Sequence, residues 1–126
     1  MYSVTVNATG GYGFDVMSDG QTVHVDAKGG AISPPAMLLA GLGSCVGVYI
    51  QKYAEGAKLD LGSFGVAVHA DFTKEPPFRF QKIAVTIDLR GAAIDERRKS
   101  ALLAFIRNCP VHNTLKTNPE VDVTIT

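Results

Sequence analysis

Charge of either sign is scarce in this sequence. Its 126 residues include 12 Lys and Arg and 12 Asp and Glu, so the formal net charge is zero. Without a basic excess, the composition gives no support for binding to nucleic acid or to an anionic membrane. Charged residues make up only 19% of the chain, against roughly 25% in a typical soluble domain. We therefore expect part of the surface to be covered by a partner, most simply a second copy of the chain.

Cysteine is scarce too, and the first residues show no leader. Two cysteines, Cys45 and Cys109, are too few for the disulfide scaffold of a small secreted domain. Because the N-terminus has neither a basic start nor an apolar run, we expect no signal peptide and a cytoplasmic location. Apolar residues make up 46% of the chain, enough to bury a core and to exclude disorder. The length predicts a single domain over residues 1–126.

One uncharged stretch is as long as a membrane span. It covers the 20 residues from Ala31 to Ile50, the length that a spanning helix needs. The stretch is nevertheless rich in small and helix-breaking residues, namely Ser33, Pro34, Pro35, Gly41, Gly43, Ser44 and Gly47. We interpret it as a helix of a soluble protein. Gly43 and Gly47 would let another backbone approach this helix closely.

Alternating apolar residues predict strands, and longer apolar patterns predict helices. A turn at Ser18–Gly20 indicates antiparallel hairpins near the N-terminus. The expected strands include residues 2–6, 22–27, 64–72, 83–89 and 121–125, and the expected helices cover residues 33–54 and 94–108. Because the strands are grouped in pairs around helices, the pattern favours an α+β fold over a parallel doubly wound sheet.

The longer helix carries the first cysteine. Ser33 can cap it, Pro34 suits its first position, and it is apolar almost all round as far as Ile50. Such a helix should be buried and central. Cys45 lies in its middle, where the neighbouring N–H groups are already bonded. A thiolate at Cys45 would therefore need a positive side chain from elsewhere in the structure.

The second cysteine precedes Pro110, which can begin a short helix. A helix N-terminus is expected to lower the pKa of the Cys109 thiol. Three other interpretations remain open from these residues alone. Cys109, His112 and Cys45 could bind zinc, although no fourth ligand is evident. A Cys–His hydrolase would need a group that orients His112. Both cysteines could also be inert core residues.

The two cysteine segments together resemble a known family. Residues 33–45, SPPAMLLAGLGSC, are similar to the cysteine-bearing helix of the OsmC/Ohr family, the osmotically inducible protein C and organic hydroperoxide resistance proteins. Residues 108–115, NCPVHNTL, are similar to the second cysteine motif of that family, and a closing strand follows. The resemblance covers nearly the whole chain. It implies an OsmC-like α+β fold, with antiparallel sheets around a long central cysteine-bearing helix, in an intertwined homodimer.

The resemblance also implies a chemistry, which is that of a thiol-dependent peroxidase acting on organic hydroperoxides or hydrogen peroxide in defence against oxidative stress. Cys45 would attack the peroxide and become a sulfenic acid, and Cys109 would condense with it to a disulfide. An external dithiol, of lipoyl type in the organic hydroperoxide branch, would then reduce the disulfide. No bound cofactor and no metal is implied.

The sequence departs from the best-known peroxidase branch at two points. That branch pairs the reactive thiolate with an arginine from the N-terminal strand region, whereas the first arginine here is Arg79. The glutamate that holds the arginine corresponds to Pro35 or Ala36. An alternative is therefore a non-peroxidase OsmC-like protein with a binding or sulfur-handling role. The cations that could replace the arginine are Lys28, Arg79 and Arg107. Lys52 lies two helical turns from Cys45 and is too far unless its side chain folds back. Arg79 is preferred because a loop arginine could reach across a dimer interface.

Overall fold

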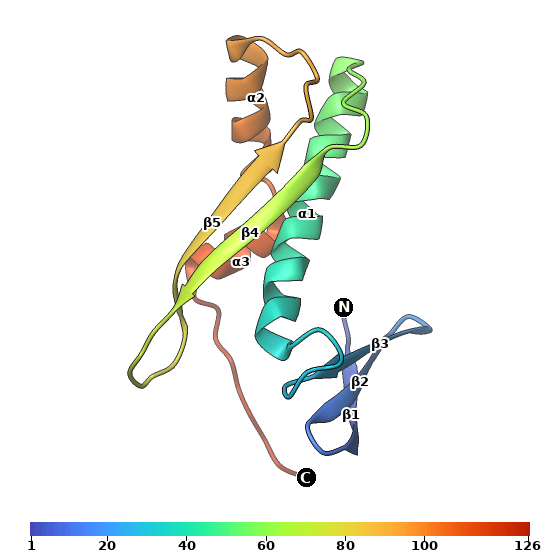
Figure 1. The fold of residues 1–126 in the computed structure, drawn as a ribbon, viewed down its shortest axis with the longest axis vertical. Coiled ribbons are helices and arrows are strands. Elements are labelled where there is room, and N and C mark those ends of the chain that lie inside the picture. Colours follow the sequence, from blue (N-terminus) through green and yellow to red (C-terminus); the bar gives the residue numbers. More distant parts are fainter. The chain divides into compact units, whose positions relative to one another are not determined.

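The computed structural model describes all residues, Met1–Thr126, and forms two compact units, Met1–Ala40 and Gly41–Thr126. The elements are β1 (Thr5–Gly10), β2 (Gly13–Ser18), β3 (Gln21–Asp26), α1 (Pro34–Ala57), β4 (Gly65–Phe72), β5 (Phe80–Asp88), α2 (Glu96–Ile106) and α3 (Pro110–Thr117). Figure 1 shows them in chain order. The α+β class is confirmed, while the single domain over residues 1–126 stays a prediction beside the division into two units.

The first unit contains a three-stranded antiparallel sheet in the order β1-β2-β3. The predicted turn between β2 and β3 is confirmed, with Asp19 at φ 49° and Gly20 at φ 75°. Positive φ at both central residues is what a tight hairpin turn of this kind requires. β1 begins at Thr5, later than expected, and the apolar pair Phe14 and Val16 belongs to a full strand, β2.

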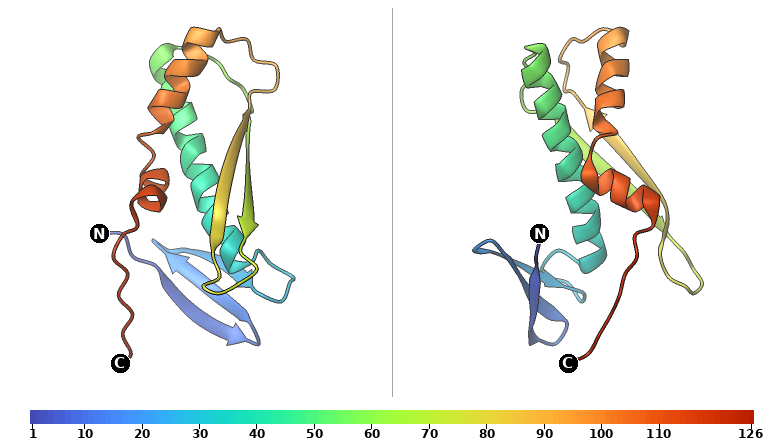
Figure 2. Two further views of the ribbon diagram at one scale, coloured as in Figure 1. Left: turned by 90° about the vertical axis from the view of Figure 1, so that its left-hand side faces the viewer. Right: turned by 180° about the vertical axis from the view of Figure 1, so that it is seen from behind.

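The second unit contains the predicted antiparallel pair β4–β5, in register from Gly65 opposite Asp88 to Ala70 opposite Ile83. Apolar residues alternate along both strands, and one set packs on the core cluster that includes α1. Figures 1 and 2 show the hairpin lying along α1. The sheet has only these two strands, so the second edge of β5 is unpaired.

The core of the second unit follows one stripe of α1. Leu42, Val46, Ile50 and Ala54 recur every four residues, and all are buried. The stripe packs with Leu61, Leu102 and Cys109 in one cluster. The long helix is thus confirmed, but the expectation that it is buried all round is wrong for the single chain. Val48, for example, is 51% exposed, because the elements of the second unit cover only part of the surface of α1.

Gly43 and Gly47 of α1 were predicted to let another backbone approach the helix, but they lie against side chains of their own chain. A Cβ atom on Gly43 would lie 3.0 Å from Cγ2 of Val68, and one on Gly47 would lie 3.9 Å from a ring carbon of Phe64. Both glycines therefore face their own chain, at β4 and at the residue that precedes it. They do not form the expected surface for another backbone, since this face of α1 is already occupied by the hairpin.

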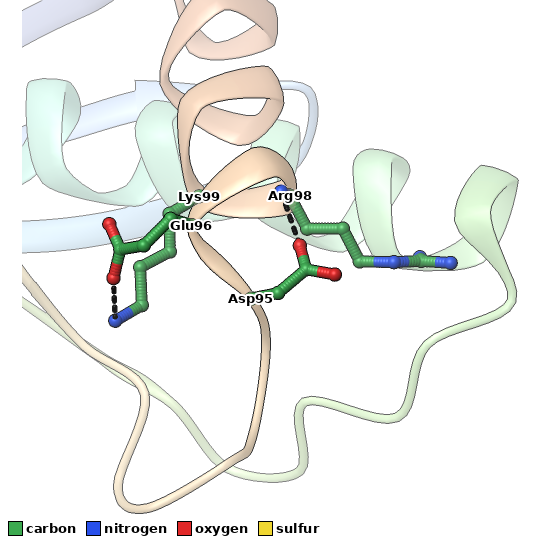
Figure 3. Close-up of polar contacts among 4 residues, drawn as sticks. All are labelled: Asp95, Glu96, Arg98 and Lys99. Atoms are coloured by element: carbon green, nitrogen blue, oxygen red, sulfur yellow. Dashed lines mark hydrogen bonds and ion pairs between the residues drawn. The ribbon is translucent and has the colours of Figure 1, made fainter.

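The predicted second helix is confirmed as α2, and Figure 3 shows how it begins. Asp95 caps it by accepting a hydrogen bond of 2.8 Å from the backbone N–H of Arg98. One turn further on, the ammonium of Lys99 lies 3.3 Å from a carboxylate oxygen of Glu96. Charged side chains thus line the exposed side of the first turn, as the sequence pattern indicates.

The strand predicted over Val121–Ile125 does not form. Residues beyond α3 have no strand partner, and Figure 1 shows them as an extended segment that ends at the C-terminus. Val121, Val123 and Ile125 are 77%, 88% and 98% exposed. A strand needs a second strand edge for its backbone hydrogen bonds, and no strand of this chain supplies one to these residues.

Only α1 is long and apolar enough to cross a membrane by length and composition, with a mean hydropathy of 1.2 over its most apolar window. The core helix of a soluble protein passes the same test, and α1 carries the main core stripe of the second unit. The helix is therefore only weak evidence for a membrane span.

Candidate cysteine site

Helix α1 holds Cys45 midway along its length. The residue is half-buried and packs against the core cluster that contains Cys109. Leu42 and Val46, on the buried stripe, lie on either side of it in the sequence. Because both fix the rotation of the helix, the Cys45 side chain is directed toward the edge of the core rather than into open solvent.

The start of α3 holds Cys109. The predicted short helix is confirmed: Cys109 is its N-cap residue, with extended backbone angles, and Pro110 follows at the first helical position. The Cys109 carbonyl accepts a hydrogen bond of 3.0 Å from Asn113, and its N–H donates one of 2.9 Å to Ile106. Cys109 is fully buried, with no exposed area. Backbone bonds on both sides therefore fix the position of its sulfur.

The structure brings the two cysteines together. Cys45 packs against the core cluster that contains Cys109, and both thiols are free. The neighbouring Cys45 favours the protonated form of the Cys109 thiol. A disulfide between the two residues requires that their Cα atoms come within about 7 Å.

Burial raises the pKa of the Cys109 thiol. The neighbouring Cys45 raises this pKa further, whereas the backbone N–H groups of His112 and Val111 lower it. The prediction of a lowered pKa is therefore wrong. The helix N-terminus does act in the expected direction, but the loss of solvation at a fully buried sulfur outweighs it.

His112 contributes its backbone rather than its ring. Its ring Nδ1 lies 3.2 Å from the side-chain oxygen of Asn113, and no hydrogen bond joins the ring to either cysteine. No group of three or more His, Cys, Asp and Glu side chains is placed to hold a metal ion. The hydrolase and zinc interpretations thus find no supporting geometry at this site.

Arg107 is the C-cap residue of α2, and the other cations considered have contacts of their own. Arg79 is exposed in the β4–β5 connection, where its guanidinium donates a hydrogen bond of 2.9 Å to the Pro77 carbonyl. The ammonium groups of Lys28 and Lys52 lie 4.8 Å from the ring centres of Tyr12 and Tyr49. Within the single chain, neither cysteine forms a hydrogen bond or an ion pair with a positive side chain.

The sequence analysis missed the aromatic side of the site. Tyr49 follows Cys45 by one helical turn and packs against the same core cluster. Its ring centre lies 5.9 Å from that of Phe105 on α2, which contacts Tyr53 at the same distance. The spacing of four residues between Cys45 and Tyr49 was the available signal, because such residues share a helix face. Tyr49 and Tyr53 thus pack against the same core cluster as Cys45.

The family described as OsmC-like protein matches residues 27–124, which include both cysteines and all elements from α1 onward. The chain belongs to the OsmC/Ohr family. The resemblance found in the two cysteine segments is thereby confirmed. A comparison with curated proteins gives no match.

Solved structures show the same OsmC-like fold. An OsmC-like protein from Mycoplasma pneumoniae is 20% identical, with a TM-score of 0.81 over 93% of this chain and 88% of that one. An organic hydroperoxide resistance protein OsmC from Legionella pneumophila is 23% identical, with a TM-score of 0.66 over 94% and 92%. The organic hydroperoxide resistance protein OhrB of Bacillus subtilis is 16% identical, with a TM-score of 0.66 and the same coverage. At these identities the similarity establishes the fold.

Proposed function

We propose that this OsmC-like protein is a thiol-dependent peroxidase that reduces organic hydroperoxides or hydrogen peroxide in defence against oxidative stress. The observation that carries the proposal is that Cys45 packs against the core cluster that contains Cys109, with both thiols free, within a fold that supports this chemistry. Two of the similar structures bear the name organic hydroperoxide resistance protein, which agrees with such a role.

The exposure of the two cysteines supports the order of their roles. Cys45 is half-buried and accessible to a small peroxide, whereas Cys109 is fully buried. The raised pKa keeps the Cys109 thiol protonated in the resting protein. Cys45 is therefore the attacking residue in this proposal, and Cys109 is the resolving residue.

The proposed cycle consumes one peroxide and one dithiol. The Cys45 thiolate attacks the terminal peroxide oxygen, the O–O bond breaks, and the alcohol or water leaves with the proton. Cys45 becomes a sulfenic acid. The Cys109 sulfur then attacks the Cys45 sulfur, which forms the S–S bond and releases water. An external dithiol, such as a lipoyl group, reduces the disulfide by exchange and becomes a disulfide itself.

We further propose that the protein acts as a homodimer in the cytoplasm. The exposed apolar residues Leu38 and Val48 on α1 support the dimer, because a long apolar helix that its own chain covers on one side only needs a partner on the other. A cation that stabilises the Cys45 thiolate could then come from the second copy, since none contacts Cys45 within the chain.

The test is consumption of cumene hydroperoxide with dihydrolipoamide as the reductant. We expect turnover by the wild type and none by Cys45→Ser. We expect Cys109→Ala to consume one peroxide per chain and to leave a sulfenic acid that dimedone traps. His69→Ala serves as the control because His69 is exposed on β4. A wild type that consumes no peroxide, although its thiols are reduced, would favour the non-peroxidase OsmC-like protein.

A further inference from the structure

Helix α2 has an exposed side that carries positive charge. Arg97, Ser100, Ala104 and Arg107 follow one another at intervals of three or four residues, a spacing that places them on one side of a helix, and all four are exposed. Leu103 borders them and is 59% exposed. We call these five residues the basic face of α2.

The positive charge of the basic face is not balanced within the chain. Neither Arg97 nor Arg107 forms an ion pair. The two acidic residues at the start of the helix have other partners, since Asp95 accepts a hydrogen bond from the backbone and Glu96 pairs with Lys99 (Figure 3). Two unpaired guanidinium groups around an exposed leucine suit an acidic protein surface that presents an apolar side chain.

The basic face ends beside the cysteine site. Arg107 is the C-cap residue of α2, and Cys109 follows two residues later as the N-cap of α3. On the inner side of the helix, the ring centre of Phe105 lies 5.9 Å from that of Tyr49, one helical turn from Cys45. A protein bound along the basic face is therefore near the cysteine of the pair that is half-buried.

The reducing step of the proposed cycle needs a reactant that arrives from solution. Cys109 is fully buried, so an incoming thiolate has access to the disulfide at the Cys45 sulfur. Within the chain no positive side chain is bonded to either cysteine, so a small free dithiol finds no charged group there that holds it. A protein held on a neighbouring surface would instead present its dithiol at a high effective concentration.

We propose that the basic face of α2 docks an acidic protein that carries the reducing dithiol, an inference that rests on the proposed peroxidase function. Acidic side chains of the carrier face Arg97 and Arg107, and an apolar side chain covers Leu103. A carrier thiolate attacks the Cys45 sulfur, the bond to the Cys109 sulfur breaks, and Cys109 takes up a proton. The second carrier thiol then displaces Cys45, so that the carrier leaves as a disulfide and both cysteines are reduced.

The first experiment measures binding and requires no turnover. The probe is a fluorescent Glu-rich peptide with one lipoyl-lysine in its oxidised form, and the matched peptide has Gln in place of every Glu. Fluorescence anisotropy should show that the wild type binds the Glu peptide about tenfold more tightly or better at low ionic strength, and that the preference disappears at high salt. Equal binding of the two peptides would overturn the proposal.

Charge reversal locates the binding surface. Arg97→Glu/Arg107→Glu should lose the preference for the Glu peptide. Lys74→Glu/Lys116→Glu reverses the same number of exposed charges outside α2 and should keep it. A preference that survives in the first variant would overturn the proposal. Tighter binding of a short single-stranded DNA than of the Glu peptide, lost in the same variant, would also overturn it, because the face would then be a nucleic-acid site.

The second experiment measures reduction of the Cys45–Cys109 disulfide after one equivalent of cumene hydroperoxide. Arg97→Glu/Arg107→Glu should lower the rate constant for the dihydrolipoyl form of the Glu peptide about tenfold or more. Uncharged dihydrolipoamide should reduce the variant and the wild type equally, which a misfolded variant would not allow. Equal rate constants with the Glu peptide would overturn the docking proposal alone. If peroxide forms no disulfide in the wild type, the peroxidase proposal fails, and the binding experiment still decides whether the face docks an acidic partner.

Discussion

At the scale of single residues, the competition between burial and the helix N-terminus sets the state of Cys109. The N–H groups of His112 and Val111 favour the thiolate, but burial and the neighbouring Cys45 favour the thiol, and the thiol prevails. In the proposed cycle, a protonated Cys109 would not compete with Cys45 for peroxide, because the thiolate is the reactive form. Cys109 would lose its proton when it attacks the sulfenic acid.

The raised pKa of Cys109 predicts a loss of stability at alkaline pH. The unfolded chain releases the thiol proton near the ordinary value of 9.0, whereas the folded chain holds it to higher pH. The contribution of Cys109 to folding is therefore complete below that value and is lost as the pH rises through the folded pKa. As the pH rises above 9.0, the free energy of unfolding measured in urea under reducing conditions should fall more steeply for the wild type than for Cys109→Ala. Equal slopes would contradict this account.

Arg79 provides a second test at this scale. Its guanidinium is bound to the Pro77 carbonyl within the β4–β5 connection, so its removal should leave the Cys45 environment unchanged. We expect the same dependence on pH for iodoacetamide alkylation of Cys45 in the wild type and in Arg79→Ala. A shift of the profile to higher pH in the variant would show that Arg79 reaches Cys45 from a second copy.

At the scale of elements, contact between α1 and β4 decides which glycines the helix tolerates. Gly43 lies under Val68, whereas a Cβ on Gly41, two residues earlier, would meet no atom within 4 Å. Glycine costs a helix about 1 kcal/mol relative to alanine. Gly41→Ala should therefore raise the free energy of unfolding by up to about 1 kcal/mol. Gly43→Ala should gain less or lose stability, since its methyl group presses on Val68. Urea unfolding measures the free energy of unfolding of both variants. An equal increase in the two would contradict the close contact between Gly43 and Val68.

The elements that the sequence predicted correctly are those specified by local pattern. The caps at Ser33 and Asp95, the turn at Asp19–Gly20 and the alternation in β4 and β5 each depend on residues close in the chain. The predictions that were wrong concern features that depend on residues far apart in the chain. Formation of a strand at Val121–Ile125 depends on a second strand edge, and the use of Gly43 depends on what packs against it.

The cysteine site also has parts that the sequence predicts and parts that it does not. The two motifs predict the two cysteines and the start of a helix at Cys109. The raised pKa of Cys109 could not be predicted, because its burial by α1 and α2 follows from the tertiary fold. The N-terminal arginine of the best-known peroxidase branch is missing from the sequence, and the substitute cation expected beside Cys45 stays a prediction.

At the scale of the whole molecule, the exposed apolar surface predicts association. Light scattering at micromolar concentration should give about twice the chain mass of 13.4 kDa. The double variant Leu38→Asp/Val48→Asp should weaken the dimer, because it places charge on the apolar side of α1. Ser100→Asp, on the exposed side of α2, is the control and should leave the mass unchanged. A monomeric wild type would contradict the dimer.

The open edge of β5 also has a consequence for solubility. An unpaired strand edge beside apolar residues is a template for any extended chain, including those of partly unfolded neighbours. A closed pair of chains that covers this edge ends such growth, whereas a chain that pairs on one side only leaves an edge free for the next. Colloidal stability would therefore depend on how completely the edge is covered.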